Sequence, residues 1–466
     1  MRKVLFTLLS SFLSILLFAN NITVSNTSLG GQNTASHFTQ VSFDVAWENS
    51  WRTSTNESNY DGAWVFVKFR KNGTTDWRHC TISSTGNTSA TGATFFIPSD
   101  NKGAFIYRSA DGIGNVSYAG NKLQWNYGVD GILDNETVEV RVFALEMVYI
   151  PQGSFQLGSG GTETNVFKDG SSANPYLVAS NAAIPFGTTA GTLNTNGSGP
   201  TSGTLPVAFP KGFNAFWVSK YECSQQQYVD FLNHLDLARA TANNTQGIFT
   251  GTHPNLVAPQ PDRAINNVSA ARLAAHADWA AMRPMTELEF EKACRGYNTP
   301  AVPNEYVWGN TTLVNVTSVT NTGLATEAVV TPTTANANTA SSLNQMVRVG
   351  IFARPTGSDR TLSGGTYYGV MNMGDNVSEL CFSVVNAQGQ AIDAGVHGDG
   401  YLAPSGNSDI AAWAPYQAYG WRGSSYSAPT TQARTSDRAN ANIYTFTYGS
   451  DVVTAAPGIR LARTAQ

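Results

Sequence analysis

Charged residues are scarce in this 466-residue chain, since Asp, Glu, Lys and Arg make up only 13% of it. The 28 basic residues are nearly balanced by 32 acidic ones, and no block of five or more lysines and arginines occurs. Proteins that bind nucleic acid or an anionic membrane surface carry such blocks, so we expect neither partner. The polar surface must come mainly from the amides and hydroxyls of Asn, Thr and Ser.

Long apolar runs are also missing, apart from one run near the N-terminus, Val4–Phe18. The run follows the basic pair Arg2 and Lys3, is shorter than the ~20 residues that span a bilayer, and precedes the small residue Ala19. Residues 1–19 therefore predict a secretory signal peptide rather than a membrane span. We expect an exported protein that is extracellular, on the cell surface or periplasmic.

Cysteine is rare as well, and its four positions are Cys80, Cys223, Cys294 and Cys381. Four cysteines are too few for a scaffold built on disulfides, although they would allow three pairings, and small buried thiols are the other interpretation. The six histidines show no zinc spacing. No Gly-x-Ser-x-Gly nucleophile elbow and no phosphate loop follows a predicted strand.

Strand patterns fill the region 20–145. Apolar residues alternate with polar or small ones in Val41–Trp47, Val65–Phe69 and Val138–Val142, and turns rich in Gly, Asn and Asp separate the runs. This pattern predicts an antiparallel β-sandwich. Its tryptophans serve core packing or, alternatively, a sugar-stacking face: Trp47, Trp51, Trp64, Trp77 and Trp125.

The second region, 146–466, begins at Glu146 without a linker, so we expect the two regions to hold a fixed orientation. Residues 158–205 are rich in Gly, Ser, Thr and Asn and predict a long surface insertion that is ordered only in part. Beyond Gly296 the chain reads as loops and short strands for 170 residues, and bound ions are one way to hold such loops. The whole chain is therefore expected to have an α+β fold.

Three helices are predicted between the insertion and this loop-rich part. The first begins at Ser224, which with Gln227 forms a Ser-x-x-Gln capping box, and the last begins at Thr286, which with Glu289 repeats the box. A further helix is expected over 269–282, where apolar residues recur with helical spacing.

Five segments of the second region together carry a family pattern. In chain order they are Met147–Gly158, Phe216–Glu222, Arg283–Gly296, Asn372–Glu379, and Arg422–Tyr426 with the terminal Gly458–Arg463. In these segments the chain resembles the formylglycine-generating enzyme, or sulfatase-modifying factor, family over residues 146 to 463. The resemblance implies a C-type-lectin-like fold for this part, but a fold alone does not settle chemistry.

The resemblance also shows what this chain lacks. In catalytic members of the family, a pair of cysteines shortly after an Arg-Gly-Gly-Ser corner binds copper and oxidises a substrate cysteine to formylglycine. Here the matching stretch Ser427–Ala433 has no cysteine, and none occurs after Cys381. Soft Cu(I) prefers thiolate ligands, so we expect neither copper nor this oxidation.

A calcium site is implied by the same resemblance, in the loop 372–379. It places Asn372 and Glu379 as side-chain ligands and Asp375 and Val377 as carbonyl donors, which is an oxygen set that suits a hard cation. Asp375 stands where the family has glycine, so it either strains the turn or adds a carboxylate. An Asx-type turn without an ion is the alternative.

The stretch Gly420–Arg438 combines a Gly/Ser corner, aromatic residues and two arginines spaced by four. We predict that it forms a ligand-binding face made of Trp421, Arg422, Tyr426, Arg434, Asp437 and Arg438. The alternative is a structural ion pair among Arg434, Asp437 and Arg438 that supports the corner.

These patterns favour an exported, non-catalytic binding or surface-assembly protein, which presents the surface 420–445 to a protein, to a glycan or to another copy of itself. One alternative is an oxidoreductase or another enzyme of the same superfamily with different chemistry. Another is a hypervariable lectin-like display protein, because some lectin-like relatives diversify this terminal region.

Overall fold

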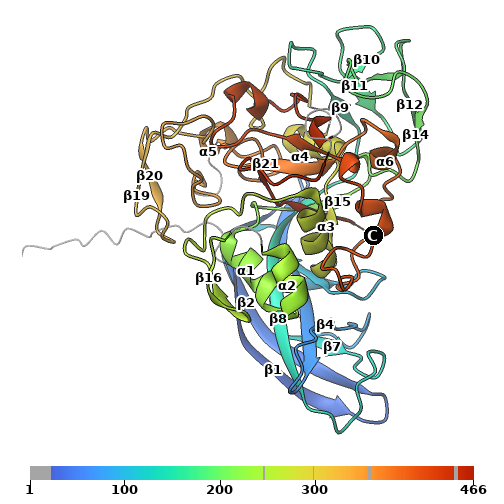
Figure 1. Cartoon of the computed structure of the whole chain (residues 1–466), viewed down its shortest axis with the longest axis vertical. Coiled ribbons are helices and arrows are strands. Elements are labelled where there is room, and N and C mark those ends of the chain that lie inside the picture. Colours follow the sequence, from blue (N-terminus) through green and yellow to red (C-terminus); the bar gives the residue numbers. More distant parts are fainter. Residues whose placement is uncertain (1–21, 245–246, 298, 355–358, 445–449, 466) are drawn as a thin grey trace, which may run out of the picture.

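The computed structural model describes residues 22–244, 247–297, 299–354, 359–444 and 450–465. The predicted signal peptide, 1–19, lies outside these residues. The described part is an α+β protein built on one 11-stranded sheet whose pairings are antiparallel. Figure 1 shows the N-terminal strands as the lower half and the loop-rich C-terminal part as the upper half. Among the described residues, no helix is long and apolar enough to cross a membrane.

The strands of the large sheet come from both halves of the chain. They are β1 (Thr23–Asn33), β2 (Phe38–Arg52), β3 (Tyr60–Lys71), β4 (Arg78–His79), β5 (Ala93–Phe96), β6 (Ala104–Arg108), β7 (Gly112–Trp125), β8 (Val138–Ile150), β15 (Phe216–Ser219), β18 (Arg283–Pro284) and β24 (Leu461–Thr464). The central order is β1-β2-β3-β8-β15-β24-β18, while β7 pairs with β2 and β6 pairs with β3.

The N-terminal strands form the predicted β-sandwich. Strands β2 and β3 pair only at the Arg52–Tyr60 step, so the sheet folds over there into two layers. The alternating apolar residues of Val41–Trp47 on β2 and of Ala63–Phe69 on β3 meet in one apolar core. Four of the five tryptophans considered above are buried, which confirms core packing rather than a sugar-stacking face for them: Trp47, Trp64, Trp77 and Trp125.

Strand β3 is buried on both of its faces. Val65 and Val67 point into the sandwich, whereas Trp64 and Phe66 pack into the core of the C-terminal part. The indole nitrogen of Trp64 donates a hydrogen bond to the carbonyl of Ala280 at 2.8 Å, next to helix α3 (Ala270–Trp279). The two cores therefore lie back to back on one strand.

Strand β8 joins the two regions without a break. It pairs with β3 from Val138 to Tyr149, and its end, Met147–Ile150, also pairs with β15. The predicted division into domains at residues 145 and 146 thus falls inside a single strand, and the hydrogen bonds on both sides of that strand continue the sheet from one half to the other. The division itself stays a prediction.

The α-helices are short. They are α1 (Gln225–Asn233), α2 (Leu237–Asn243), α3, α4 (Glu287–Arg295), α5 (Arg360–Ser363) and α6 (Ala387–Gln390). Both predicted capping boxes are present, with Ser224 and Gln227 at α1 and Thr286 and Glu289 at α4. Helix α2 was not predicted. In Figure 1, α1, α2 and α3 lie where the two halves meet.

The segment 158–205 is packed onto the C-terminal part rather than loosely ordered as we expected. It contains two-residue and three-residue strands that pair in small ladders: β10 (Lys168–Asp169) with β13 (Leu193–Asn194), β12 (Ile184–Pro185) with β14 (Thr204–Leu205), and β11 (Tyr176–Val178) with β9 (Phe155–Leu157). Its apolar residues enter the C-terminal core: Val178, Ile184, Phe186, Leu193 and Leu205 among them. The scattered apolar residues of this segment therefore attach it to the C-terminal core.

The remaining short strands hold the loops of the C-terminal part. They are β16 (Thr250–Thr252), β17 (Asn255–Val257), β19 (Ser318–Thr320), β20 (Ala328–Thr331), β21 (Ser378–Phe382), β22 (Tyr419–Arg422) and β23 (Pro457–Gly458). Strand β21 lies between β22 and β23 in a three-stranded sheet. This small sheet places the loop 372–379 beside the corner 420–438.

Candidate functional site

The corner 420–438 starts on strand β22 and leaves it by a tight turn. Glu379 of β21 pairs with Arg422 of β22 in the small sheet, so the two candidate sites adjoin. Gly423 then adopts a φ of +71°, which a residue with a side chain rarely adopts, and its Cβ position would meet the carbonyl oxygen of Met373 at 2.9 Å. A glycine is needed here for the chain to turn.

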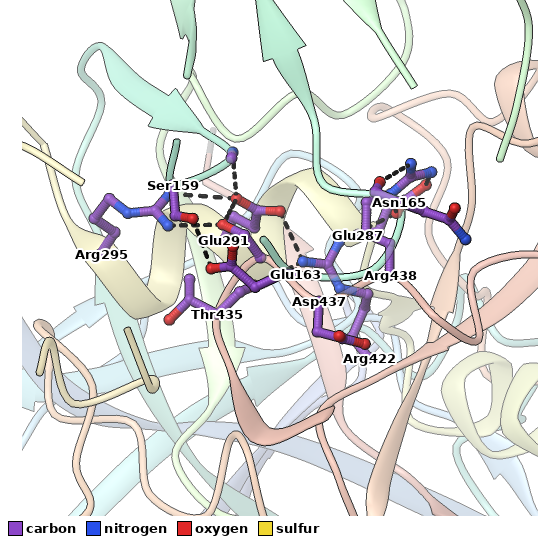
Figure 2. Close-up of polar contacts among 12 residues, drawn as sticks. Ser159, Glu163, Asn165, Glu287, Glu291, Arg295, Arg422, Thr435, Asp437 and Arg438 are labelled. Carbon is purple, nitrogen blue, oxygen red and sulfur yellow. Dashed lines mark hydrogen bonds and ion pairs between the residues drawn. The ribbon is translucent and has the colours of Figure 1, made fainter. Parts of the chain in front are cut away.

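Helix α4 presents two carboxylates to the corner. Glu287 and Glu291 are four residues apart and lie on one face of the helix. Arg422 donates hydrogen bonds to Glu287 at 3.1 Å and to Glu291 at 2.7 Å, and Arg438 donates to Glu287 at 2.7 Å. Arg295, one further turn along the helix, donates to Glu291 at 3.3 Å. Figure 2 shows this row of alternating charges along α4.

Arg422 and Arg438 are therefore internal groups. Their side chains are 1% and 0% exposed, so a ligand in solvent does not reach them. Burial alone would raise the pKa of Glu287, but the charges of Arg438 and Arg422 outweigh burial and lower it. The arrangement is a buried ion-pair network, in which Arg438 is paired with a glutamate of α4 and not with Asp437.

Arg438 also connects the insertion to the corner. Its guanidinium donates to the carbonyls of Asn165, Thr195 and Ser198 at 3.0 to 3.1 Å. These carbonyls lie in loops outside the paired strands, so no neighbouring strand donates a hydrogen bond to them. Buried carbonyls need such donors. This one side chain therefore fixes two distant loops against helix α4.

The other predicted binding residues lie at different depths. Trp421 and Asp437 are buried, and Asp437 accepts hydrogen bonds from the backbone of Thr164 and Ala439. Tyr426 and Arg434 are half-buried, so part of each side chain faces solvent. Of the six predicted residues, these two have side chains that a ligand in solvent can contact.

Glu163 is a corner residue that sequence reasoning missed. One carboxylate oxygen accepts hydrogen bonds from the hydroxyl of Ser159 at 2.6 Å and from the backbone of Asn304 at 3.1 Å, while Oε2 has no partner. The side-chain oxygen of Asn304 accepts a hydrogen bond from Arg434 at 3.1 Å, so Glu163 and Arg434 both contact Asn304. Burial raises the pKa of Glu163, and burial also raises the pKa of Asp437.

The predicted calcium loop 372–379 is buried and tightly hydrogen-bonded. The side-chain oxygen of Asn372 accepts from the backbone of Gly350 at 2.7 Å, and Asp375 accepts from the backbone of Asn338 at 2.8 Å. Val377 directs its backbone N–H to Glu222 at 3.0 Å. Asn372 has a φ of +54°, so the loop contains a left-handed residue, as an Asx-rich turn often does.

Negative charge is in excess around this loop. Glu222, Asp375 and Glu379 are all at most 1% exposed, and Arg460 is the cation that faces them. Arg460 donates to Glu379 Oε1 at 2.7 Å, whereas Glu379 Oε2 has no partner. Burial raises the pKa of all three carboxyl groups, and a divalent cation beside them would stabilise their charged forms. The donor set therefore fits calcium in charge and in ligand type.

The residues present do not fit copper. All four cysteines are free and buried: Cys80, Cys223, Cys294 and Cys381. Burial raises the pKa of each thiol, which disfavours the thiolate that binds copper. The stretch Ser427–Ala433, where the family carries its cysteine pair, offers hydroxyl groups, an amide and alanines instead.

Glu287, Glu291 and Arg295 of α4 were visible in the sequence as charged residues spaced by four. Their burial was not foreseen, because charges on a short helix usually face solvent. Glu222 and Arg460 carried no comparable signal, since 238 residues of chain separate them.

The chain was also compared with known proteins. The model of the sulfatase-modifying factor enzyme 1-like domain matches residues 135–465. This match includes β8, the helices, the corner and the loop 372–379. No curated protein sequence matches the chain.

Proposed function

Because the chain belongs to the family of sulfatase-modifying factor enzyme 1-like domains, we propose that it is an exported, non-catalytic member that acts as a binding or surface-assembly protein. One observation carries this proposal. The corner that supplies the reactive cysteines in catalytic relatives has no thiol here, and its arginines Arg422 and Arg438 are held in buried ion pairs.

The binding face is the outer side of the corner, around Tyr426 and Arg434. Ser427, Pro429 and Thr431 beside them are exposed, so a hydroxyl-rich, weakly charged surface surrounds one aromatic ring and one guanidinium. Aromatic and arginine side chains dominate the binding energy of protein interfaces, and both also contact sugars well. The partner is a protein, a glycan or a second copy of this chain.

Two assays on the mature protein, residues 20–466, test this face. Sedimentation velocity follows self-association, and a glycan array follows sugar binding. We expect at least one positive result, and we expect the double variant Tyr426→Ser/Arg434→Gln to lose it at unchanged melting temperature. Arg78→Gln, on the exposed part of the sandwich, is the control. A double variant that binds and assembles like the wild type would contradict the proposal.

Export rests on the predicted signal peptide. Mass spectrometry of the protein recovered from its native host is expected to give an N-terminus near Asn20. A protein recovered from the cytoplasm with residues 1–19 intact would refute this part of the proposal.

An enzyme with different chemistry is the second candidate. It is favoured by Glu163 and Asp437, two buried carboxyl groups with raised pKa on either side of Thr164, because such groups serve as general acids or bases at active sites. A turnover screen with small thiols and oxygen, with and without added iron(II), tests it. Turnover that Glu163→Gln abolishes would establish this candidate, and no turnover, or turnover that the variant retains, would remove it.

Calcium is proposed as a structural ion of the loop 372–379. The side chains of Asn372 and Glu379 and the carbonyls of Asp375 and Val377 would hold it, and the ion would offset the excess of buried carboxylates. A ligand present at 100 times its Kd stabilises by about 2.7 kcal/mol, which for a chain of this size is roughly 3 °C in Tm.

We therefore expect a chelator to lower Tm by roughly 3 °C, measured by scanning calorimetry. Glu379→Gln should remove most of the difference between the calcium and chelator scans. The control Glu289→Gln breaks another buried ion pair, with Arg283, and should keep that difference. Identical scans of the wild type with calcium and with chelator would refute the site.

A further inference from the structure

A cleft of about 370 Å³ lies where the sandwich meets the C-terminal part, and none of the residues 420–438 lines it. One wall is the end of β2 and the loop after it, 49–59, and the other is formed by Ala353, Arg354 and residues of the segment 360–371. Its volume falls within the range of small-molecule sites, which often form between two structural units. The lining side chains used below are Trp51, Glu57, Lys220, Arg354, Arg360 and Tyr367.

The two walls are fixed to each other. The side chain of Asn59 donates to the carbonyl of Tyr368 at 2.8 Å, and the hydroxyl of Tyr297 donates to the carbonyl of Asn56 at 2.8 Å. Gly369 packs so closely on the Trp51 ring that a Cβ would meet it at 2.8 Å. The cleft is thus formed before any ligand arrives, which lowers the entropic cost of binding.

Arg360 is a cation without an anion. Its guanidinium makes no ion pair among the described residues, and Nη1 is buried without a hydrogen-bond partner. The group lies 5.4 Å from the centre of the Tyr367 ring. Glu305 attracts it from a distance, but that carboxylate is bound to Arg295 at 2.5 Å. Burial lowers the pKa of Arg360, as expected for a guanidinium that has lost water without gaining a partner.

The rest of the lining leaves the cleft positive. Arg354 donates only to the carbonyls of Leu362 and Thr333, so its charge is not neutralised by a carboxylate among the described residues. Lys220 is different, because it donates to Asp61 at 2.9 Å and to Glu146 at 3.1 Å and is almost fully buried.

Among the described residues that line the cleft, the one acidic side chain is Glu57. Arg354 and Arg360 therefore outnumber the opposing charge. Two guanidinium groups would attract a bound anion, and one carboxylate would repel it.

We propose that this cleft binds a small organic anion, whose carboxylate or phosphate group pairs with Arg360 and Arg354 and whose uncharged part lies against Trp51 and Tyr367. Guanidinium groups bind both oxyanions in a two-pronged geometry, which gives orientation as well as affinity. The site is separate from the proposed binding face, so either one can fail without the other.

Isothermal titration of the full mature chain tests this site with three probes: D-glucuronate for the carboxylate, inorganic phosphate for the phosphate, and D-glucose as the neutral control. We expect glucuronate or phosphate to bind with a Kd of about 1 mM or tighter and glucose not to bind. Arg360→Gln should weaken binding at least tenfold and Arg354→Gln should weaken it less, whereas Arg78→Gln should have no effect. The anion that binds with the lower Kd shows whether the site prefers a carboxylate or a phosphate group.

Arg360→Gln should fold normally, because the guanidinium makes no ion pair in the described structure, and its Tm serves as the check. Two outcomes would overturn the proposal. One is the absence of binding of both anions at 10 mM. The other is binding that Arg360→Gln, at unchanged Tm, leaves as tight as in the wild type.

Discussion

In the sandwich, the side chains that fill the core are aliphatic or aromatic, whereas in the C-terminal part arginines are among the largest fully buried side chains. The sandwich core is drawn from alternating residues of β2, β3 and β7. The arginines buried below 2% exposure all lie in the second region: Arg283, Arg422, Arg438, Arg460 and Arg463. One chain thus contains two kinds of interior.

The difference follows from how each half provides hydrogen-bond partners for its backbone carbonyls. In the sandwich, paired strands bond their own carbonyls, so the core needs only apolar packing. In the loop-rich half, cationic side chains donate to carbonyls outside the strands, as Arg460 does for Met371 and as Lys211 does for Pro206. Buried cations thus stabilise a part of the fold that has few paired strands. From the sequence alone, we expected bound metal ions to have this role.

Removing one such cation should have the largest effect. Arg438→Met leaves Glu287 with one arginine and removes the guanidinium donor from the carbonyls of Asn165, Thr195 and Ser198. We expect a loss of about 3 to 5 kcal/mol in unfolding free energy, measured by urea denaturation.

The matched control for this change is Arg434→Gln, at the half-buried edge of the same corner, which should cost less than about 1 kcal/mol. If Arg438→Met proved as mild as the control, the ion-pair network would not hold the loops as described.

Acid should destabilise the C-terminal part through its buried histidines. Burial lowers the pKa of His276 to about 3, against about 6.5 in the unfolded chain. Its contribution to stability is complete above pH 6.5 and is lost as the pH falls toward 3, because the unfolded chain takes up the proton first. At pH 4.5 the loss is roughly 2 to 3 kcal/mol.

The variant His276→Leu should therefore show a smaller fall in unfolding free energy between pH 7 and pH 4.5, measured by urea denaturation at each pH. His37→Leu, on the exposed surface of the sandwich, should keep the wild-type fall. Equal pH profiles for wild type and His276→Leu would mean that His276 does not drive the acid response.

A substitution in the sandwich core should have the smallest and simplest effect. Val67→Ala removes two methyl groups from a fully buried site and should cost about 1 to 2 kcal/mol. Because no charged group is involved, we expect the same cost at pH 5 and at pH 8 and in low and high salt. A cost that changed with pH or salt would show that the sandwich interior is coupled to the ionic one.

The sequence predicted the local features well, because local physics determines them. The capping boxes at Ser224 and Thr286 place the starts of α1 and α4, and the alternating pattern of Val41–Trp47 identifies a strand with one buried face. The run Ala63–Phe69 is apolar at nearly every position, which indicates a strand buried on both faces, but only its alternate residues were interpreted.

The partners of the corner arginines could not be predicted in the same way. Glu287 lies 151 residues before Arg438, and only the folded chain brings them together. The alternative of a structural ion pair was correct in kind for Arg438 but wrong in partner, since Asp437 bonds to backbone N–H groups instead. Long-range pairing of charges is decided by tertiary structure, which local patterns do not encode.

The central claim is that this chain keeps the fold of its family without the copper chemistry of the catalytic members. The most direct test incubates the purified protein with Cu(I), a reductant, oxygen and a cysteine-containing substrate peptide, and measures formylglycine by mass spectrometry beside a catalytic family member. We predict no conversion above the level of copper in buffer. Conversion that requires both this protein and copper would contradict the account.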